Sequence, residues 1–289
     1  MPARASPTTH LAISALWDEL AAFPSSRIDE ALTHLMAWLQ EHLDVDDVFW
    51  LGGVLMLDGQ AAAGDPLLGW RLRARQGLLP QSEAQRQLRA SYLGKEHYGR
   101  LTSAYFTGTP RPDDEVHVGE TTRNLARRAG QFRAQRLRDG FVDYAAFRQT
   151  EHYRRYYTAQ GVTDRIWVIA PVDEHTESVF VLDRHRRAGL TRRRPFTDRD
   201  TALAAAALRG QRRFHRQMIL SNGALRGVKA LSPLKRRVLL CLLTGQADKE
   251  VAAQVKLRPL SLRKYLTELY GEYGVKTRAG LMALWLGEG

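Results

Sequence analysis

The stretch from Pro259 to Tyr273 contains the side chains whose types and spacing most suggest binding chemistry. In an α-helix each residue turns by about 100°, which places four apolar residues within about 60° of one another: Leu262, Leu266, Leu269 and Tyr273. The opposite side carries Arg263, Lys264 and Thr267, with Leu260 and Gly271 beside them. A helix with one packed face and one basic face suits the major groove of DNA.

The residues before this helix have the layout of a helix-turn-helix unit. Ser232 is a good N-cap and Pro233 suits the first helical position. Apolar residues at helical spacing then lead to Gly245, which suits the position just after a helix end. A second short helix is predicted at 248–255, and residues 256–258 form a turn before the basic helix begins.

Positive charge is concentrated in the same region. The chain has 289 residues, with 43 Lys and Arg against 31 Asp and Glu, so its formal net charge is +12. Residues 225–289 contribute +7 of this charge, from 12 basic and 5 acidic residues. Dense positive charge on a small unit favours a polyanion such as nucleic acid, although a solvated basic surface has the same composition.

These residues resemble the LuxR-type helix-turn-helix domain, without gaps from about Leu231 to Leu284. Several apolar, Gly, Glu and Arg positions agree together: Leu231-Ser232-Pro233, Val238-Leu239, Thr244-Gly245, Lys249-Glu250-Val251-Ala252, Ser261-Leu262-Arg263, Tyr270 and Gly274–Leu281. The resemblance implies four helices, of which the third reads the major groove. It also implies double-stranded DNA as the partner.

Carried over residue by residue, the resemblance implies six DNA contacts. Three residues would face base edges and three would meet phosphates: Arg263, Lys264 and Thr267, and then Lys249, Arg258 and Ser261. Glu250 and Arg278 match structural polar positions, so we expect no base contacts from them. The fourth helix, at about 277–286, commonly forms the dimer contact in this family, so a homodimer is expected.

Three positions depart from the family pattern. Lys235 stands where a Glu would close a capping box with Ser232, at a cost below about 2 kcal/mol. Arg258 replaces the usual Ser or Thr N-cap of the third helix, and the proline that follows compensates in part. Ala247 replaces the usual cap of the second helix, where Asp248 could cap with a shift of one residue.

The first 220 residues predict helices around an antiparallel sheet, an α+β arrangement. Helices are expected at 14–23, 28–43, 82–93, 144–160 and 198–220, and strands at 47–57, 69–78, 164–172 and 178–183. Gly52-Gly53 interrupts the first strand and suggests a β-bulge. Residues 173–175 join the last two strands as a hairpin, Thr197 caps the last helix, and residues 132–144 fit either a strand or a helix.

The order strand, hairpin, Arg-Pro-Phe-Thr and long helix is similar to GAF-like sensory domains that precede LuxR-type units. This resemblance covers about Trp17 to Leu220. It divides the chain into a sensory and dimerisation domain, a linker and a DNA-binding domain, at 12–220, 221–230 and 231–289. Such domains often hold a small molecule between sheet and helices. Six aromatic residues could line that pocket, or could belong to the core: Trp50, Trp70, Tyr144, Tyr153, Tyr157 and Trp167.

The other chemistry-bearing residues match no catalytic or metal-binding pattern. Cys241 is the single cysteine, which excludes an intrachain disulfide and a Cys-based zinc site. The nine histidines include no His-x-x-x-His pair, and the sequence has no Gly-rich phosphate loop and no Gly-x-Ser-x-Gly elbow. We therefore expect no enzyme activity, no metal and no cofactor.

The sequence predicts a soluble, cytoplasmic protein, because it has no signal peptide and no apolar run of about 18 residues that could span a membrane. We expect a dimeric, sequence-specific transcription regulator whose N-terminal domain senses a small molecule or a protein partner. Two alternatives keep the DNA-binding unit: an acyl-homoserine-lactone receptor, and a ligand-free domain that only dimerises or binds a protein. A third alternative places catalysis in the first 220 residues.

Overall fold

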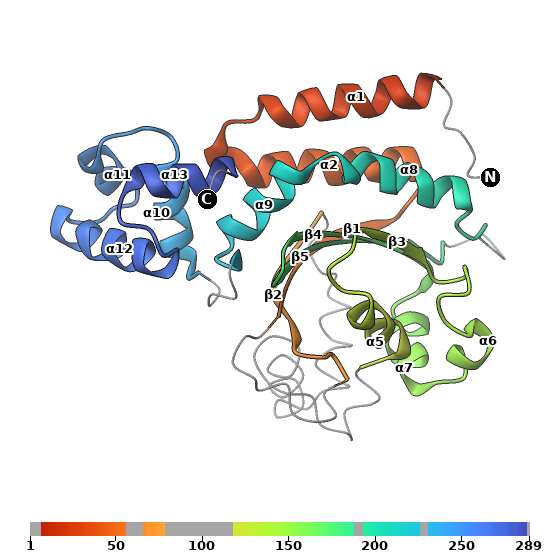
Figure 1. Cartoon of the computed structure of the whole chain (residues 1–289). Coiled ribbons are helices and arrows are strands. Elements are labelled where there is room, and N and C mark those ends of the chain that lie inside the picture. Colours follow the sequence, from red (N-terminus) through yellow and green to blue (C-terminus); the bar gives the residue numbers. More distant parts are fainter. Residues whose placement is uncertain (1–6, 56–65, 79–117, 188–192, 226–230, 288–289) are drawn as a thin grey trace.

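The computed structural model describes residues 7–55, 66–78, 118–187, 193–225 and 231–287. Within these ranges the protein is α+β, with helices on both faces of an antiparallel sheet (Figure 1). The helix expected at 82–93 lies outside the described residues.

Five strands form one antiparallel sheet in the order β2-β1-β5-β4-β3. They are β1 (Asp47–Leu55), β2 (Trp70–Gly77), β3 (Arg133–Arg136), β4 (Val162–Asp173) and β5 (Thr176–His185). The hairpin between β4 and β5 is confirmed, and the register of β1 against β2 shifts between Gly52 and Gly53, as the predicted bulge requires. In the ambiguous segment 132–144 the structure has the short strand β3.

Different helices cover the two faces of this sheet (Figure 1). One face packs against α2 (Ile28–Leu43), α8 (Asp198–Arg209) and α9 (Arg212–Ser221), while α1 (Pro7–Ala22) lies on α2 and α8; the short helix η1 (Ser25–Arg27) precedes α2. The other face carries α5 (Glu120–Arg127), α6 (Tyr144–Phe147), α7 (Glu151–Tyr153) and the π-helical segment η3 (Arg154–Thr158). Each face has its own apolar cluster.

The single helix expected from Asp198 to Leu220 is wrong, because the structure has two helices that meet at Gly210. Thr197 caps α8 as predicted, through a capping box with the residue three positions on. Trp17 of α1 closes the space beside the break, since a Cβ at Gly210 would lie 2.6 Å from its indole ring. The Trp17 Nε1 also donates a hydrogen bond to Ala207 O at 2.8 Å. Glycine is unfavourable in the interior of a helix. Because the packed indole leaves no room for a Cβ at position 210, the residue here is glycine and the helix is interrupted.

The continuous helix expected at 144–160 is also wrong. Thr150 lies between α6 and α7, where its Oγ1 accepts a hydrogen bond from Tyr153 N at 3.1 Å and its hydroxyl donates to Phe147 O at 2.7 Å. A threonine hydroxyl that bonds to the backbone in this way caps a new helix in place of continuing the old one.

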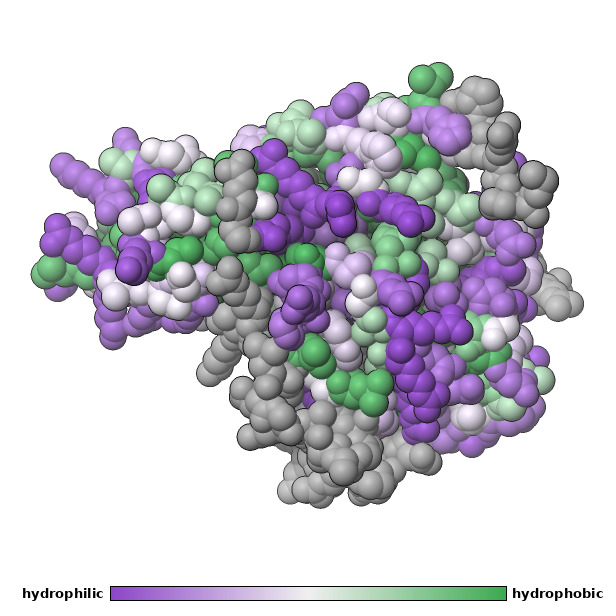
Figure 2. Space-filling model, in the orientation of Figure 1, coloured by the Kyte–Doolittle hydropathy of each residue, from purple (hydrophilic) through white to green (hydrophobic). Residues whose placement is uncertain are grey.

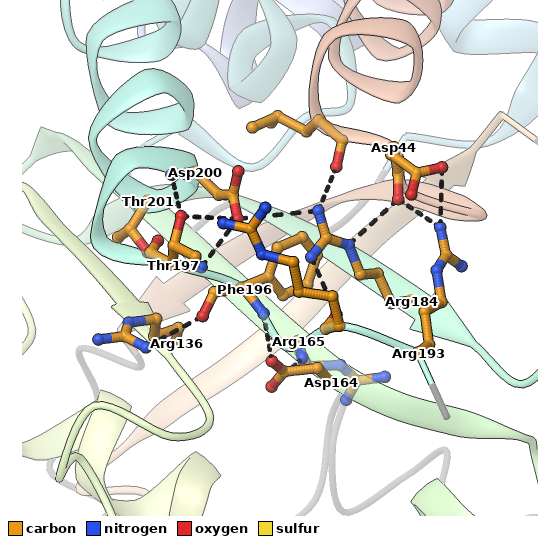
Figure 3. Close-up of polar contacts among 12 residues, drawn as sticks. Asp44, Arg136, Asp164, Arg165, Arg184, Arg193, Phe196, Thr197, Asp200 and Thr201 are labelled. Carbon is orange, nitrogen blue, oxygen red and sulfur yellow. Dashed lines mark hydrogen bonds and ion pairs between the residues drawn. The ribbon is translucent and has the colours of Figure 1, made fainter. Parts of the chain in front are cut away.

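Charged side chains fasten the segment before α8 to the sheet (Figure 3). Arg184 of β5 donates to Leu43 O at 2.7 Å and to Asp44 O at 3.1 Å, and its guanidinium lies 3.9 Å from the centre of the Phe196 ring. Asp164 of β4 accepts a hydrogen bond from Phe196 N at 2.7 Å, and burial raises the pKa of Asp164. These contacts hold α2, the sheet and α8 in fixed positions.

After residue 231 the structure has the helices α10 (Pro233–Leu242), α11 (Asp248–Gln254), α12 (Pro259–Glu272) and α13 (Arg278–Leu286). All four agree closely with the bounds predicted from the sequence. Their buried side chains continue the apolar cluster of α2 and α9, because α13 contacts α9 and α10 contacts η1.

Candidate functional site

The helix α12 has the two faces that the sequence predicts. Leu262, Leu266 and Leu269 are buried. All six predicted DNA-contacting residues are exposed: Lys249, Arg258, Ser261, Arg263, Lys264 and Thr267. Hydrophilic side chains gather at the end of the molecule formed by α11 and α12 (Figure 2). A row of cations and hydroxyls that solvent can reach is able to donate hydrogen bonds to phosphates and base edges.

Two of the six side chains make contacts within α12 itself. Lys264 is 79% exposed, and its Nζ lies 4.0 Å from a carboxylate oxygen of Glu268. Such an i,i+4 surface pair contributes only about 0.3–0.5 kcal/mol, so it competes weakly with a phosphate. Thr267 Oγ1 donates to Arg263 O at 3.1 Å, which orients the threonine methyl and hydroxyl along the helix surface.

The turn between α11 and α12 sets the position of the basic face. Lys256 has a φ of 58°, in the left-handed region, and Leu257 N donates to Ala252 O at 2.8 Å. Pro259 occupies the first turn of α12, while Arg258, the N-cap residue, makes no side-chain cap hydrogen bond. Proline at this position needs no donor partner for its nitrogen and pre-sets the helical φ, so the helix begins without a capping side chain.

The polar positions that we expected to be structural do hold the helices. Glu250 accepts a hydrogen bond from Ala247 N at 2.8 Å, at the start of α11. Ala247 is the N-cap residue, so the predicted shift of the cap to Asp248 is wrong. Arg278 donates to two backbone carbonyls, one at the end of α10 and one in the loop after it.

Lys235 joins α10 to α12. Ser232 Oγ accepts a hydrogen bond from Lys235 N at 3.3 Å, and the Lys235 ammonium lies 2.8 Å from Glu268 and 2.6 Å from Glu272. The hydrogen bonds that the ammonium donates to these two carboxylates raise the pKa of Lys235. In the sequence this lysine only prevents a capping box, whereas in the structure its ammonium links α10 to α12.

A second candidate site is a cavity of about 190 Å³ between the sheet and α5. Apolar and aromatic side chains from four strands and from α5 make most of its wall, including Phe49, Leu51, Trp70, Leu125, Ile169, Val179 and Val181. Such a cavity can hold an apolar molecule.

Buried ion pairs provide the polar part of the cavity wall. Arg133 binds Glu177 through two hydrogen bonds of 2.7 and 2.9 Å, and these side chains are only 7% and 5% exposed. Arg165 binds Asp183 at 2.5 and 2.6 Å, and its guanidinium lies 4.8 Å from the centre of the Tyr157 ring. Although burial opposes ionisation of Asp183, the charge of Arg165 holds the pKa of that carboxyl below its ordinary value.

The structure brings two of the six predicted pocket residues, Trp70 and Trp167, into the cavity wall. Trp50 instead packs in the cluster on the other face of the sheet. Tyr157 contacts Arg165 from the second cluster. Tyr144 and Tyr153 lie against that cluster, with their hydroxyls 3.2 Å apart, and do not line the cavity.

Sequence reasoning missed the charged residues of the cavity wall. The signal was present as strand alternation, because Arg165, Trp167 and Ile169 share one face of β4. Glu177 and Val179 likewise share one face of β5. Aromatic type alone selected Trp50 together with Trp167, although β1 places Trp50 on the opposite face.

In the described part of the chain, no group of three or more His, Cys, Asp or Glu side chains is placed to hold a metal ion. None of the helices described is both long and apolar enough to cross a membrane. Cys241 is buried, and burial raises the pKa of its thiol.

Comparison with known proteins finds a curated relative, the probable HTH-type transcriptional regulator GfsR from Streptomyces halstedii. Identity is 36% over 58 residues, which cover 20% of this chain and 24% of that protein, so the match spans about a quarter of the relative. No protein-family model matches the chain.

Two solved structures are similar to the whole chain, at low scores. A structure of SdiA in complex with octanoyl-rac-glycerol has a TM-score of 0.41 and 11% identity, over 99% of this chain and 98% of the other. A crystal structure of Escherichia coli SdiA has a TM-score of 0.39 and 9% identity, over 96% and 97%. Likenesses this remote carry no argument about fold or ligand.

Proposed function

We propose that this protein is a DNA-binding transcription regulator that places α12 in the major groove. The observation that carries the proposal is the exposed basic face of α12, opposite three buried leucines. The 58-residue similarity to a probable HTH-type transcriptional regulator supports it independently. A short helix, α11, and a turn precede α12, and α11 contacts α12, which is the order of elements in a helix-turn-helix unit.

In this proposal the six exposed residues have two kinds of role. Arg263 and Lys264 donate hydrogen bonds to base edges, where a guanidinium can pair with guanine O6 and N7, and Thr267 lies beside them. The other three residues meet phosphates and set the register: Lys249, Arg258 and Ser261. The acidic residue nearest this face, Glu268, is directed to Lys235 and so repels phosphate less.

A mobility-shift titration tests this proposal. The probe is a DNA duplex enriched by the full-length protein from a randomised pool. We expect the double variant Arg263→Ala, Lys264→Ala to weaken binding by about tenfold or more, because each base contact is worth about 1–3 kcal/mol. The matched control is Arg199→Ala, Arg212→Ala, which removes the same charge from exposed positions of α8 and α9. Equal binding by the two double variants would overturn the proposal.

We propose further that residues 12–220 sense an effector and that 231–289 bind DNA, in a homodimer. The sensing proposal rests on the cavity between the sheet and α5, which combines apolar walls with the buried Arg133–Glu177 pair. This combination favours a mainly apolar molecule with one polar group. In the single chain, Leu281, Leu284 and Trp285 of α13 are buried, so a dimer contact through α13 would use its other residues.

Native mass spectrometry of the full-length protein tests the cavity. We expect a small-molecule adduct on the wild type that is lost in Val179→Phe, whose ring would fill the cavity, and retained in Ala159→Phe at an exposed position. Thermal unfolding of both variants shows whether they are folded. A folded wild type that carries no adduct from any expression host would favour the ligand-free alternative, and an adduct on Val179→Phe would place the effector elsewhere.

A further inference from the structure

Leu260 is a large apolar side chain that points away from the protein. It is the second residue of α12 and is 78% exposed, the highest value for a large hydrophobic residue in the described part of the chain. Burial of a leucine side chain stabilises a protein, because it removes apolar surface from water. The other leucines of α12 gain this energy and Leu260 does not, so its apolar surface remains available to a binding partner.

Leu260 belongs to the face of α12 that we assign to DNA. With Lys264, Thr267 and Gly271 it forms a stripe at i, i+4, i+7 and i+11, which spans about 60° of the helix circumference. All four residues are exposed. The long side chains of this stripe lie at its N-terminal end, because Thr267 and Gly271 are small. Reading helices approach base edges with their N-terminal residues, which is where Leu260 lies.

The residues around Leu260 indicate that its binding partner is not a protein. Its exposed neighbours are Arg258, Pro259, Ser261, Arg263 and Lys264. Apolar docking sites for proteins are contiguous patches of several hundred Å², whereas this is one leucine and an adjacent proline among cations. A polyanion that also displays an isolated apolar group fits this surface.

We propose that Leu260 reads thymine, by placing its side chain against the C5-methyl group of one thymine in the major groove. The inference rests on the proposed DNA binding by α12. That methyl is the apolar group that distinguishes thymine on the major-groove edge. A leucine can neither donate nor accept a hydrogen bond, so it cannot replace the base contacts of Arg263 and Lys264. It adds a preference at a neighbouring base pair.

Deoxyuridine tests the inference, because uracil lacks only the methyl group. The full-length wild-type protein first enriches a duplex from a randomised pool, and each preferred thymine is then replaced singly by deoxyuridine. We expect one replacement to weaken wild-type binding by about fourfold, the value of one buried methyl group. Leu260→Ser should bind the thymine and uracil duplexes equally, and Leu260→Met should retain the preference.

The control is Leu11→Ser, a second exposed leucine that lies on α1, which should keep the wild-type preference. Wild-type binding that tolerates uracil at every position would overturn the inference, and so would an unchanged preference in Leu260→Ser. In both cases the enriched duplex would still support DNA binding. A wild type that enriches no duplex would instead overturn the DNA-binding proposal and this inference with it.

Discussion

His215 of α9 forms part of a buried polar chain that reaches the sheet. Trp50 Nε1 donates to Ser178 Oγ at 2.8 Å, that oxygen lies 2.8 Å from His215 Nδ1, and His215 Nε2 lies 2.9 Å from Leu208 O. A carbonyl only accepts, so Nε2 carries a proton. Burial lowers the pKa of His215 to about 4, so the imidazole is neutral near pH 7 and Nδ1 accepts from the serine hydroxyl.

This histidine makes folding stability depend on pH. The unfolded chain protonates His215 below about pH 6.5, whereas the folded protein does so only below about pH 4. Between these values the unfolded state binds more protons, so stability falls as the pH falls, by about 3 kcal/mol over the whole window. We expect urea unfolding at several pH values to show a flatter profile for His215→Gln than for the wild type. The exposed His10→Gln should keep the wild-type profile, and parallel profiles for all three proteins would contradict the prediction.

The two candidate sites differ in how far single residues could be predicted from sequence. On α12 the helical period alone separates Leu262 and Leu266 from Arg263, and burial in the structure follows that division. The cavity residues were predicted from their aromatic type. Residue type does not distinguish a Trp that lines a cavity from one that packs on the other face of the sheet. Trp50 is engaged with Ser178 on the far side, which only strand pairing could reveal.

At the scale of elements, helix ends were predictable where local signals set them. The start and end of α10 and the start of α12 are set by residues close to them in sequence: Ser232, Pro233, Gly245 and Pro259. The observed bounds agree with this prediction. The long helix predicted through Gly210 failed for a different reason. Gly210 was a local breaking signal that the helical pattern around it outweighed, and the indole of α1 that packs against this glycine is far away in sequence.

Ion pairs between different helices could also not be predicted from local sequence patterns. The sequence places Lys235 in the first turn of α10, where a cation opposes the helix dipole. The structure shows the compensating contact with Glu268 and Glu272, which lie more than thirty residues away on α12. The same contact draws the acidic residues of α12 toward α10, which leaves the basic face facing outward.

At the scale of the whole molecule, the helices after residue 231 are docked on the N-terminal part. Tyr273 donates its hydroxyl to Leu220 O of α9 at 2.5 Å, and Arg216 Nε of α9 donates to Leu284 O of α13 at 2.9 Å. The helix α9 also carries His215, so it contacts both the sheet and α13. The position of α12 relative to the sheet therefore depends on this interface.

An ion pair contributes to this interface. Arg236 of α10 donates two hydrogen bonds, of 2.6 and 2.5 Å, to the carboxylate of Asp29 in the first turn of α2. Their side chains are 19% and 47% exposed, so solvent weakens the pair and its loss should cost about 1 kcal/mol. We expect Asp29→Ala to speed amide hydrogen exchange in residues 234–242 by about fivefold, because these amides open with the interface. Glu30→Ala is the matched control, because this neighbouring acid pairs with Arg27 and not with α10. The charge-swapped pair Asp29→Arg, Arg236→Asp should restore slow exchange. Equal exchange in Asp29→Ala and Glu30→Ala would show that apolar packing alone holds α10 in place.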